Sequence, residues 1–381
     1  MSKKKILVFI DWYLPGYKAG GPIRSCANLV GHLGAEFDFS IVTRNTDYTE
    51  SEPYPKISSD EWNVQEDGSR IYYFSEGNLQ GKNIRRLISQ SDYDAVYLNG
   101  IYSVYFTLYP LMYLRKKRDK LVVVAVRGML NESAISIKKT KKKFFLRAVK
   151  VLRLFNRVVF HATSKDEQRD IEMQFGSKNR VLVAGNLPAK VNLQSNPFRA
   201  KETGSVSCVS IARIAPEKNL LYALQVLAKV KDITVYFDIF GPVYDAAYWK
   251  TCSVLIDSMP ENVHVSYCGS IANELVSETL SRHHFLFLPS AGENFGHIIL
   301  QALSAGCPLV ISDKTPWRGL QMKHSGWDLS LEKQELFVSV LQECGRLNQS
   351  EFNLLSQNAF ALARHYQYDL RLVEDNRRLF E

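Results

Sequence analysis

Short apolar runs alternate with stretches of helical periodicity along almost the whole chain. Amphipathic segments lie at 22–33, 103–117, 142–155 and 165–175. In the first half, the apolar runs between and around them are ILVFI (6–10), FDFSIVT (37–43), RIYYF (70–74), AVYLN (95–99), LVVVAV (121–126), RVVFHAT (157–163) and RVLVA (180–184). Strands that are apolar on both faces and are separated by helices indicate a parallel sheet covered on both sides.

A polar segment with two prolines, NLPAKVNLQSNPFRAKETGS (186–205), interrupts this alternation. The pattern then restarts with VSCVSI (206–211), ITVYFDIF (233–240), VHVSY (263–267), FLFLP (285–289) and PLVIS (308–312). A length of 381 residues suits two domains of ordinary size. We therefore predict two doubly wound α/β domains, residues 1–188 and 189–361, with a tail from about 362 to 381 packing back on the first.

The loops that follow strands are the places to look for chemistry, because ligands of open α/β sheets bind beyond the carboxyl ends of the strands. The strongest candidate is LPSAGENFGHIILQALSAGCPLVISD (288–313), in which a strand ends at Pro289 and a small-residue loop leads into a helix. Amide groups at that helix start suit a diphosphate. The candidate donor-binding residues are Glu293, Asn294, Phe295, Gly296, which lets a ligand approach the backbone, His297, and Gln301, which would reach a ribose. For Glu293 taken alone, the alternative is an acidic residue that merely favours a helix start.

A second candidate segment, SIARIAPEKNL (210–220), follows the first strand of the second domain. It places Arg213 and Lys218 at the carboxyl edge of the sheet. Two cations there can neutralise a diphosphate leaving group and so lower the barrier for breaking its bond to a sugar. Considered without the 288–313 segment, they are ordinary surface charges.

A third segment, DWYLPGYKAGGPIRS (11–25), follows the first strand of all. Gly20 and Gly21 belong to a glycine-rich loop that leads into a helix and would close over the phosphates of a substrate. Pro22 and Ile23 replace the Lys and Ser/Thr of a phosphate loop, and no GxGxxG follows any strand. A plain strand-to-helix turn is the alternative interpretation.

Together, Arg213, Lys218, the GENFGHIILQALSAG segment and the early glycine loop resemble the family 4 glycosyltransferases of the GT-B fold. The resemblance covers essentially the whole chain and implies two Rossmann-like domains facing a central cleft. It further implies that the C-terminal domain binds the nucleotide, that the anomeric configuration is retained, and that Arg213 and Lys218 contact the diphosphate. The first acid of the family's Glu-x7-Glu motif, here Glu293, would lie against the donor sugar as the catalytic residue, and the second would hold the ribose.

The sequence departs from the family pattern at two positions. Position 301 is Gln, a neutral side chain that both donates and accepts hydrogen bonds where the family has a carboxylate. In the first domain, VAVRGMLNES places Arg127 where many relatives have a His near the acceptor. Arg127 would bind an acceptor phosphate or hydroxyl, but its pKa is too high for a general base. The chain resembles a branch found in bacterial surface-polysaccharide clusters.

Charge and composition indicate that the protein has an anionic partner. The net charge is +9, and the stretch KKTKKKFFLRAVKVLRLFNR (138–157) places basic residues around an apolar set at helical spacing: Phe144, Phe145, Ala148, Val151, Leu152 and Phe155. Such a helix suits an anionic membrane surface, although a packed helix with a solvated charged face is equally compatible. No nucleic-acid-binding module accompanies the charge. The opening MSKKKILVFI lacks a cleavage site and no run reaches the length of a membrane helix, so we expect a cytoplasmic protein, peripheral on the inner face of the plasma membrane.

These observations predict a retaining hexosyltransferase that needs neither a cofactor nor a metal. Its partners would be a nucleotide-diphosphate sugar as donor and a glycan, or a saccharide linked to polyprenyl diphosphate, as acceptor. Asp92-Tyr93-Asp94 spells the metal-binding DxD of another glycosyltransferase fold, but it precedes a strand and is expected to be a surface turn. The alternatives are a non-catalytic nucleotide-sugar or glycan-binding protein, which Gln301 favours, and a sugar-nucleotide epimerase on the same architecture.

Overall fold

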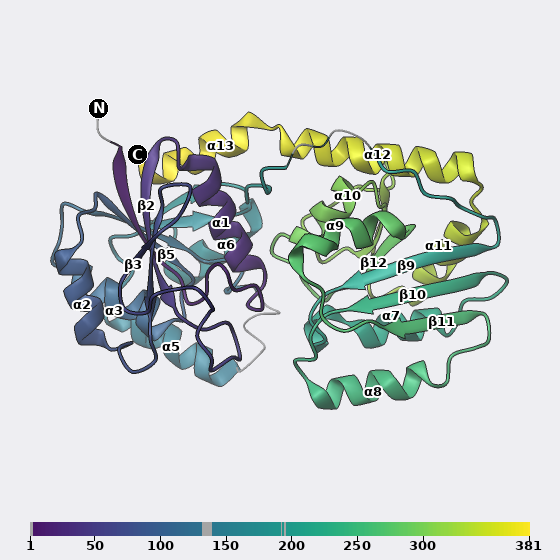
Figure 1. Ribbon diagram of the computed structural model, residues 1–381, viewed down its shortest axis with the longest axis horizontal. Helices are drawn as coiled ribbons and strands as arrows, with labels where there is room; N and C mark the ends of the chain where they lie inside the picture. Colours follow the sequence, from purple (N-terminus) through teal and green to yellow (C-terminus); the bar gives the residue numbers. More distant parts are fainter. Residues whose placement is uncertain (1–2, 132–138, 192, 194–195) are drawn as a thin grey trace. The chain divides into compact units, whose positions relative to one another are not determined.

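The computed structural model describes residues 3–131, 139–191, 193 and 196–381, and it divides into two compact units (Figure 1). Unit 1 comprises Met1–Lys190 with Asp369–Glu381, and unit 2 comprises Val191–Tyr368. Each unit has its own hydrophobic cores and one sheet, mainly parallel in unit 1 and wholly parallel in unit 2. This is the α/β architecture that the alternation of apolar runs predicts.

Unit 1 is built on an eight-stranded sheet in the order β3-β4-β2-β1-β5-β6-β7-β8, in which only the β3–β4 pair is antiparallel among the described strands. The strands are β1 (Lys4–Phe9), β2 (Phe37–Arg44), β3 (Trp62–Val64), β4 (Arg70–Phe74), β5 (Ala95–Asn99), β6 (Leu121–Ala125), β7 (Val159–Ala162) and β8 (Arg180–Val183). The helices are α1 (Gly21–Leu33), α2 (Gly81–Gln90), the π-helical η1 (Val104–Leu108), α3 (Tyr109–Leu114), α5 (Lys139–Val151), α6 (Lys165–Phe175), α13 (Leu370–Arg377) and η3 (Arg378–Phe380).

Unit 2 has a six-stranded, wholly parallel sheet in the order β11-β10-β9-β12-β13-β14. The strands are β9 (Ser205–Ile211), β10 (Thr234–Phe240), β11 (Val263–Tyr267), β12 (Phe285–Leu288), β13 (Leu309–Ser312) and β14 (Gly326–Leu329). The helices are η2 (Pro216–Lys218), α7 (Leu220–Leu227), α8 (Ala246–Ile256), α9 (Asn273–Arg282), α10 (His297–Ser304), α11 (Gln334–Arg346) and α12 (Gln349–Gln367). The order reverses between β9 and β12, so the loops after these two neighbouring strands emerge at the switch point where such sheets bind ligands.

Both faces of each sheet are covered, as the doubly apolar strands require. In β1, Leu7 and Phe9 belong to one core, whereas Ile6 and Val8 belong to the core on the opposite face. In β12, Phe285 and Phe287 likewise face away from the core that holds Leu286 and Leu288. Alternation of this kind follows from the two-residue period of a strand.

The C-terminal segment returns to unit 1, where α13 packs against α1 (Figure 1). The boundary lies between Tyr368 and Asp369, later than the position near 362 expected from the sequence. The reason is that α12 continues through that position, with Ala359 and Ala363 buried in a core of unit 2. The ion pair of Arg377 with Glu36 then holds α13 to unit 1.

The buried face of helix α5 is not the face that the sequence pattern predicts. Of the apolar set expected on one face, Phe155 is buried and Phe145 packs against a core, whereas Phe144, Val151 and Leu152 are exposed. Leu146 and Val149, which were outside that set, are buried instead. Of the basic stretch 138–157, residue 138 lies outside the described residues. The outward face of the helix therefore mixes apolar and cationic side chains.

Candidate functional site

The loop after β9 carries the two predicted cations of unit 2. The strand ends at Ile211, and Pro216 begins the short 3-10 helix η2, which ends at Lys218. Asn219 then adopts a left-handed conformation with φ 59° and begins α7. Its Nδ2 donates to the carbonyl of Pro289 at 3.0 Å, so this loop is tied to the loop that follows β12.

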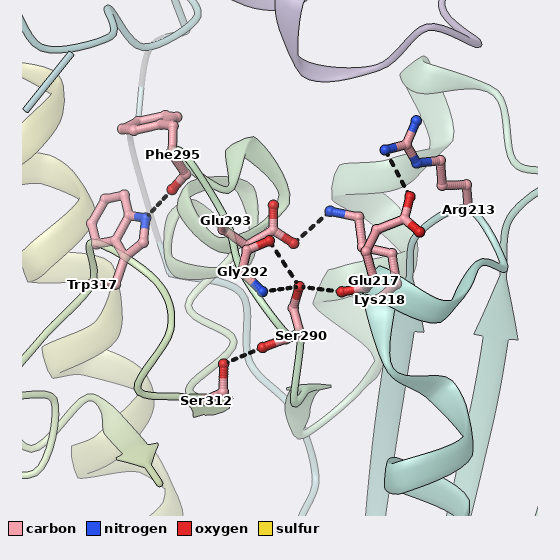
Figure 2. Close-up of polar contacts among 9 residues, drawn as sticks. All are labelled: Arg213, Glu217, Lys218, Ser290, Gly292, Glu293, Phe295, Ser312 and Trp317. Carbon is pink, nitrogen blue, oxygen red and sulfur yellow. Dashed lines mark hydrogen bonds and ion pairs between the residues drawn. The ribbon is translucent and has the colours of Figure 1, made fainter. Parts of the chain in front are cut away.

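Two buried serines hold the loop after β12 in place (Figure 2). Ser290 donates from Oγ to the carbonyl oxygen of Glu217 at 3.1 Å, and the amide of Ala291 donates to the same oxygen at 3.0 Å. Ser312, at the end of β13, donates to the carbonyl of Ser290. Hydrogen bonds of this kind fix the backbone on either side of the acidic residue that follows.

Lys218 and Glu293 meet across these two loops (Figure 2). The Lys218 Nζ lies 2.5 Å from the Glu293 Oε1, with side-chain exposures of 19% and 10%. The amide of Glu293 donates to the carbonyl of Lys314 at 3.0 Å, which anchors the backbone of the acidic residue independently of its side chain. A charge-assisted hydrogen bond in so shielded a position is stronger than a surface ion pair.

Arg213 takes a different partner. Its Nη2 lies 3.0 Å from the Oε1 of Glu217, and its guanidinium lies over the ring of Tyr244 at 5.6 Å from the centroid. With 38% of its side chain exposed, Arg213 is open to solvent. Each of the two cations is thus paired with a carboxylate.

The start of α10 combines a glycine cap with an aromatic support. Gly296, the residue before the helix, has φ 75°, a left-handed conformation that favours glycine. Phe295 packs against Trp317 and Tyr366, with ring centroids 5.7 and 5.6 Å away, and the Trp317 Nε1 donates to the carbonyl of Phe295 at 2.6 Å. The aromatic cluster therefore fixes the backbone just before the helix.

The other predicted residues of this segment lie on the same turns. His297 is the first residue of α10, and its ring meets that of Phe295 edge-on at 4.8 Å. Gln301 lies one helical turn further on the same face as His297, and both are partly exposed. Asn294, between Glu293 and Phe295, is also partly exposed. The structure thus gathers Lys218, Glu293, Asn294, Phe295, Gly296, His297 and Gln301 in one region of unit 2.

The glycine-rich loop lies in unit 1, where hydrogen bonds to Asp47 anchor its backbone. Asp47 is buried and its Oδ2 accepts from the amides of Tyr17 and Lys18 at 2.9 and 3.2 Å. Gly20, with φ 79°, caps α1, which begins at Gly21. The role of Gly20 and Gly21 over donor phosphates remains a prediction.

Arg127 is buried within unit 1, with 9% exposure. Its guanidinium donates to the Oδ1 of Asn99 at 2.8 Å, the Oδ1 of Asn186 at 2.6 Å and the Oη of Tyr97 at 2.7 Å. The Tyr97 hydroxyl also bonds His161, whose pKa is lowered to about 3 by burial and by the nearby Arg127 charge. Three of the five N–H donors of Arg127 are thus used within the protein. The role of Arg127 in binding an acceptor remains a prediction.

Sequence reasoning did not single out Glu217, Ser290, Ser312 and Trp317, all of which shape the site. Glu217 directly precedes Lys218 and has no sequence signal of its own. Serine is common in loops, so Ser290 and Ser312 do not stand out by residue type. The sequence signal for the two serines is their position: Ser290 lies two residues after β12, and Ser312 is the last residue of β13. Adjacent parallel strands end at the same edge of a sheet, so the two side chains are expected near the ligand-binding edge.

Within the described ranges, no group of three or more His, Cys, Asp or Glu side chains could hold a metal ion. Asp92 and Asp94, from the DxD-like triplet, bond Lys5 at the amino end of β1. Of the helices in those ranges, none is long and apolar enough to cross a membrane.

Comparison with known proteins places the fold. Residues 191–324 match the family model described as glycosyl transferases group 1, and no curated protein matches the chain in sequence. The chain resembles HepE from Anabaena, solved with UDP and glucose, at 16% identity and a TM-score of 0.70, covering 99% of this chain and 98% of that one. Sucrose-phosphate synthase from Thermosynechococcus elongatus (13% identity, TM-score 0.69, coverage 100% and 98%) and the lipopolysaccharide outer core galactosyltransferase WaaB (15%, 0.62, 99% and 99%) are similar as well. The predicted GT-B fold is confirmed.

Proposed function

We propose that this protein is a retaining family 4 glycosyltransferase that moves a hexosyl group from a nucleoside-diphosphate sugar to a glycan acceptor. The Lys218–Glu293 pair carries the proposal, because it joins a cation and an acid at the switch point of unit 2, inside the segment that matches the group 1 model. The complex of HepE with UDP and glucose supports a nucleotide-sugar donor.

The cations of unit 2 suit a diphosphate leaving group. In the proposed reaction, the bond between the anomeric carbon and the diphosphate oxygen breaks, and its electron pair leaves with the nucleoside diphosphate. Lys218 and the partly exposed Arg213 neutralise the negative charge that develops there. We assign this role to the two side chains, with no metal or cofactor required. Glu217 and Glu293 release the cations in part when the diphosphate arrives.

Glu293 acts on the sugar side of the same bond. Its backbone is held by Lys314, and its carboxylate is only 10% exposed, so its negative charge is poorly screened. A carboxylate in that position orients the sugar and stabilises the positive charge that builds up at the ring in the transition state. The acceptor oxygen attacks on the face from which the diphosphate leaves, its proton passes to the departing phosphate, and the anomeric configuration is retained.

The rival functions are distinguished by their products. The purified protein would be incubated with UDP-, GDP- and ADP-hexoses and a saccharide acceptor, and both the nucleotide and the sugar would be followed by mass spectrometry and NMR. A transferase yields nucleoside diphosphate and an elongated acceptor in equal amounts. An epimerase yields a converted nucleotide sugar without acceptor, and a non-catalytic binding protein leaves both substrates unchanged; either result would reject transfer.

Gln301 is proposed to hold the donor ribose, where relatives have a carboxylate. The variant Gln301→Glu is therefore expected to bind the nucleoside diphosphate about fivefold more tightly, because hydrogen bonds to charged groups are worth about 1 kcal/mol more than neutral ones. Calorimetry with the nucleotide and its 2′,3′-dideoxy form measures this gain. An equal gain with the dideoxy form would contradict contact with the ribose.

We also propose that the acceptor is a saccharide linked to polyprenyl diphosphate in surface polysaccharide synthesis, and that the protein works in the cytoplasm against the inner face of the membrane. Phe144, Val151 and Leu152 are 75%, 81% and 54% exposed. Residues 139–157 contain eight Lys and Arg and no Asp or Glu: Lys139, Lys141, Lys142, Lys143, Arg147, Lys150, Arg153 and Arg157. Exposed apolar groups among cations match an anionic lipid surface.

Replacing Phe144 and Val151 together with serine should weaken binding to vesicles containing phosphatidylglycerol by about 30-fold or more, since each apolar side chain contributes roughly 1 kcal/mol or more when it enters the lipid. Sedimentation with vesicles, with and without the anionic lipid, measures the change. Met173→Ser on α6, which removes a 77% exposed apolar side chain of the same unit, is the control. Binding that is unchanged in the double variant would contradict the membrane role of α5.

A further inference from the structure

A carboxylate, a guanidinium and a hydroxyl converge at the carboxyl edge of the unit 1 sheet. Asp11 follows β1, Arg44 ends β2 and Ser103 follows β5, and these three strands are neighbours. Ser103 accepts from the amide of Phe106 at 3.1 Å and donates to the Asp11 Oδ1 at 2.9 Å. Arg44 Nη2 lies 3.7 Å from the same oxygen. Asp11 is the first residue of the 11–25 segment, whereas Arg44 and Ser103 were not singled out by the sequence pattern.

The second oxygen of Asp11, Oδ2, has no hydrogen-bond partner among the described residues. The side chain is 24% exposed, so a ligand can approach it. Burial raises the pKa of the Asp11 carboxyl, while Ser103 and Arg44 oppose that shift. The Nε of Arg44 is buried and likewise has no partner within the described ranges. The Arg44 Nε is enclosed, so a ligand would meet the exposed 27% of the Arg44 side chain and the partly exposed Asp11 carboxylate, which gain free energy from complementary hydrogen bonds.

Aromatic rings surround these polar groups. The Arg44 guanidinium carbon lies 5.6 Å from the ring centroid of Trp12, 5.8 Å from that of Tyr105 and 5.5 Å from that of Phe106. Phe106 is fully buried, whereas Trp12 and Tyr105 are partly exposed. Tyr48 supports Trp12 edge-on, with centroids 4.9 Å apart. A sugar ring presents C–H groups on its faces and hydroxyls around its rim, and an aromatic surface beside a carboxylate and a guanidinium complements both.

We propose that Asp11, Arg44 and Trp12 form the binding site for the acceptor saccharide. The Asp11 Oδ2 accepts hydrogen bonds from acceptor hydroxyls, Arg44 donates to ring or hydroxyl oxygens, and the sugar packs on Trp12. The assignment rests on the proposed transferase function and gives the acceptor an accessible site, in contrast to the buried Arg127. The edge of the sheet where it lies is the one at which doubly wound folds bind ligands.

Saturation-transfer NMR with the methyl glycosides of glucose, galactose and mannose tests the site directly. At least one of them is expected to give a signal with the wild type and to lose at least tenfold in affinity in Asp11→Asn. Asp38→Asn, near the start of β2 and exposed, is the matched control and should behave as the wild type. Trp12→Leu should weaken the same sugar, and it provides the test if Asp11→Asn does not fold.

Calorimetry with UDP, GDP and ADP on the same samples separates this proposal from the donor site. An unchanged sugar affinity in a folded Asp11→Asn or Trp12→Leu variant would overturn the acceptor site. So would a wild type that binds a nucleotide but none of the three sugars. If the wild type binds sugars but no nucleotide, the result contradicts the proposed donor function and supports the saccharide site.

Discussion

Replacing Glu293 with glutamine should lower the rate of sugar transfer by about 100- to 1,000-fold, the loss typical when one preorganised electrostatic contact to a transition state is removed. Glutamine keeps the shape of the side chain and an oxygen that Lys218 can bond, but it has no negative charge to stabilise the sugar ring. The affinity for the nucleoside diphosphate should therefore change by less than about threefold. Steady-state kinetics gives kcat, and calorimetry gives Kd.

Glu335→Gln is the matched control, because Glu335 also faces a lysine, Lys229, but lies at the exposed surface of α11. It should leave kcat unchanged. A Glu293→Gln enzyme with near-normal kcat would contradict the role assigned to the carboxylate. A variant that lost nucleotide affinity and transfer in parallel would make Glu293 part of the diphosphate site instead.

Replacing Lys218 with alanine should weaken nucleoside-diphosphate binding by about 10- to 100-fold, since a charge-assisted hydrogen bond contributes roughly 1.5–3 kcal/mol. The same change deprives Glu293 of its counter-ion in a position that is 10% exposed, so the variant should also be less stable. Calorimetry measures the affinity, and urea unfolding measures the stability.

The double variant Lys218→Ala/Glu293→Ala separates these two effects. Removing both charges should recover stability relative to Lys218→Ala, and the coupling energy follows from the double-mutant cycle. Nucleotide affinity should stay low, because the cation is still missing. Lys229→Ala, on an exposed lysine of the same unit, should change neither quantity. Full nucleotide affinity in Lys218→Ala would show that the lysine does not contact the diphosphate.

The meeting of Lys218 with Glu293 was predictable from the sequence, although the two residues lie 75 positions apart. Each follows an apolar run that reads as a buried strand, and carboxyl ends of parallel strands share one edge. In the structure β9 and β12 are adjacent parallel strands. The loops that follow them are therefore close enough for Lys218 to contact Glu293. Strongly apolar strands such as β5 and β12 were predictable for the same reason, because burial on both faces leaves a continuous signal.

Features that depend on tertiary packing were not predictable in this way. The short edge strand β3 has three residues and too little pattern to detect. In α5, Phe144 and Phe145 are equally apolar, and only the position of the sheet decides that the first is exposed and the second packed on the core. Arg127 follows a strand as an acceptor-binding residue should, yet Asn99, Asn186 and Tyr97 from other segments accept three of its hydrogen bonds.

The central claim is that unit 2 holds the nucleotide of a sugar donor, and calorimetric titration of the wild-type protein with UDP, GDP, ADP and CMP tests it most directly. We expect one nucleoside diphosphate to bind clearly more tightly than the others and than the monophosphate CMP, because the proposed function assigns Arg213 and Lys218 to the diphosphate. The failure of all four nucleotides to bind would contradict it.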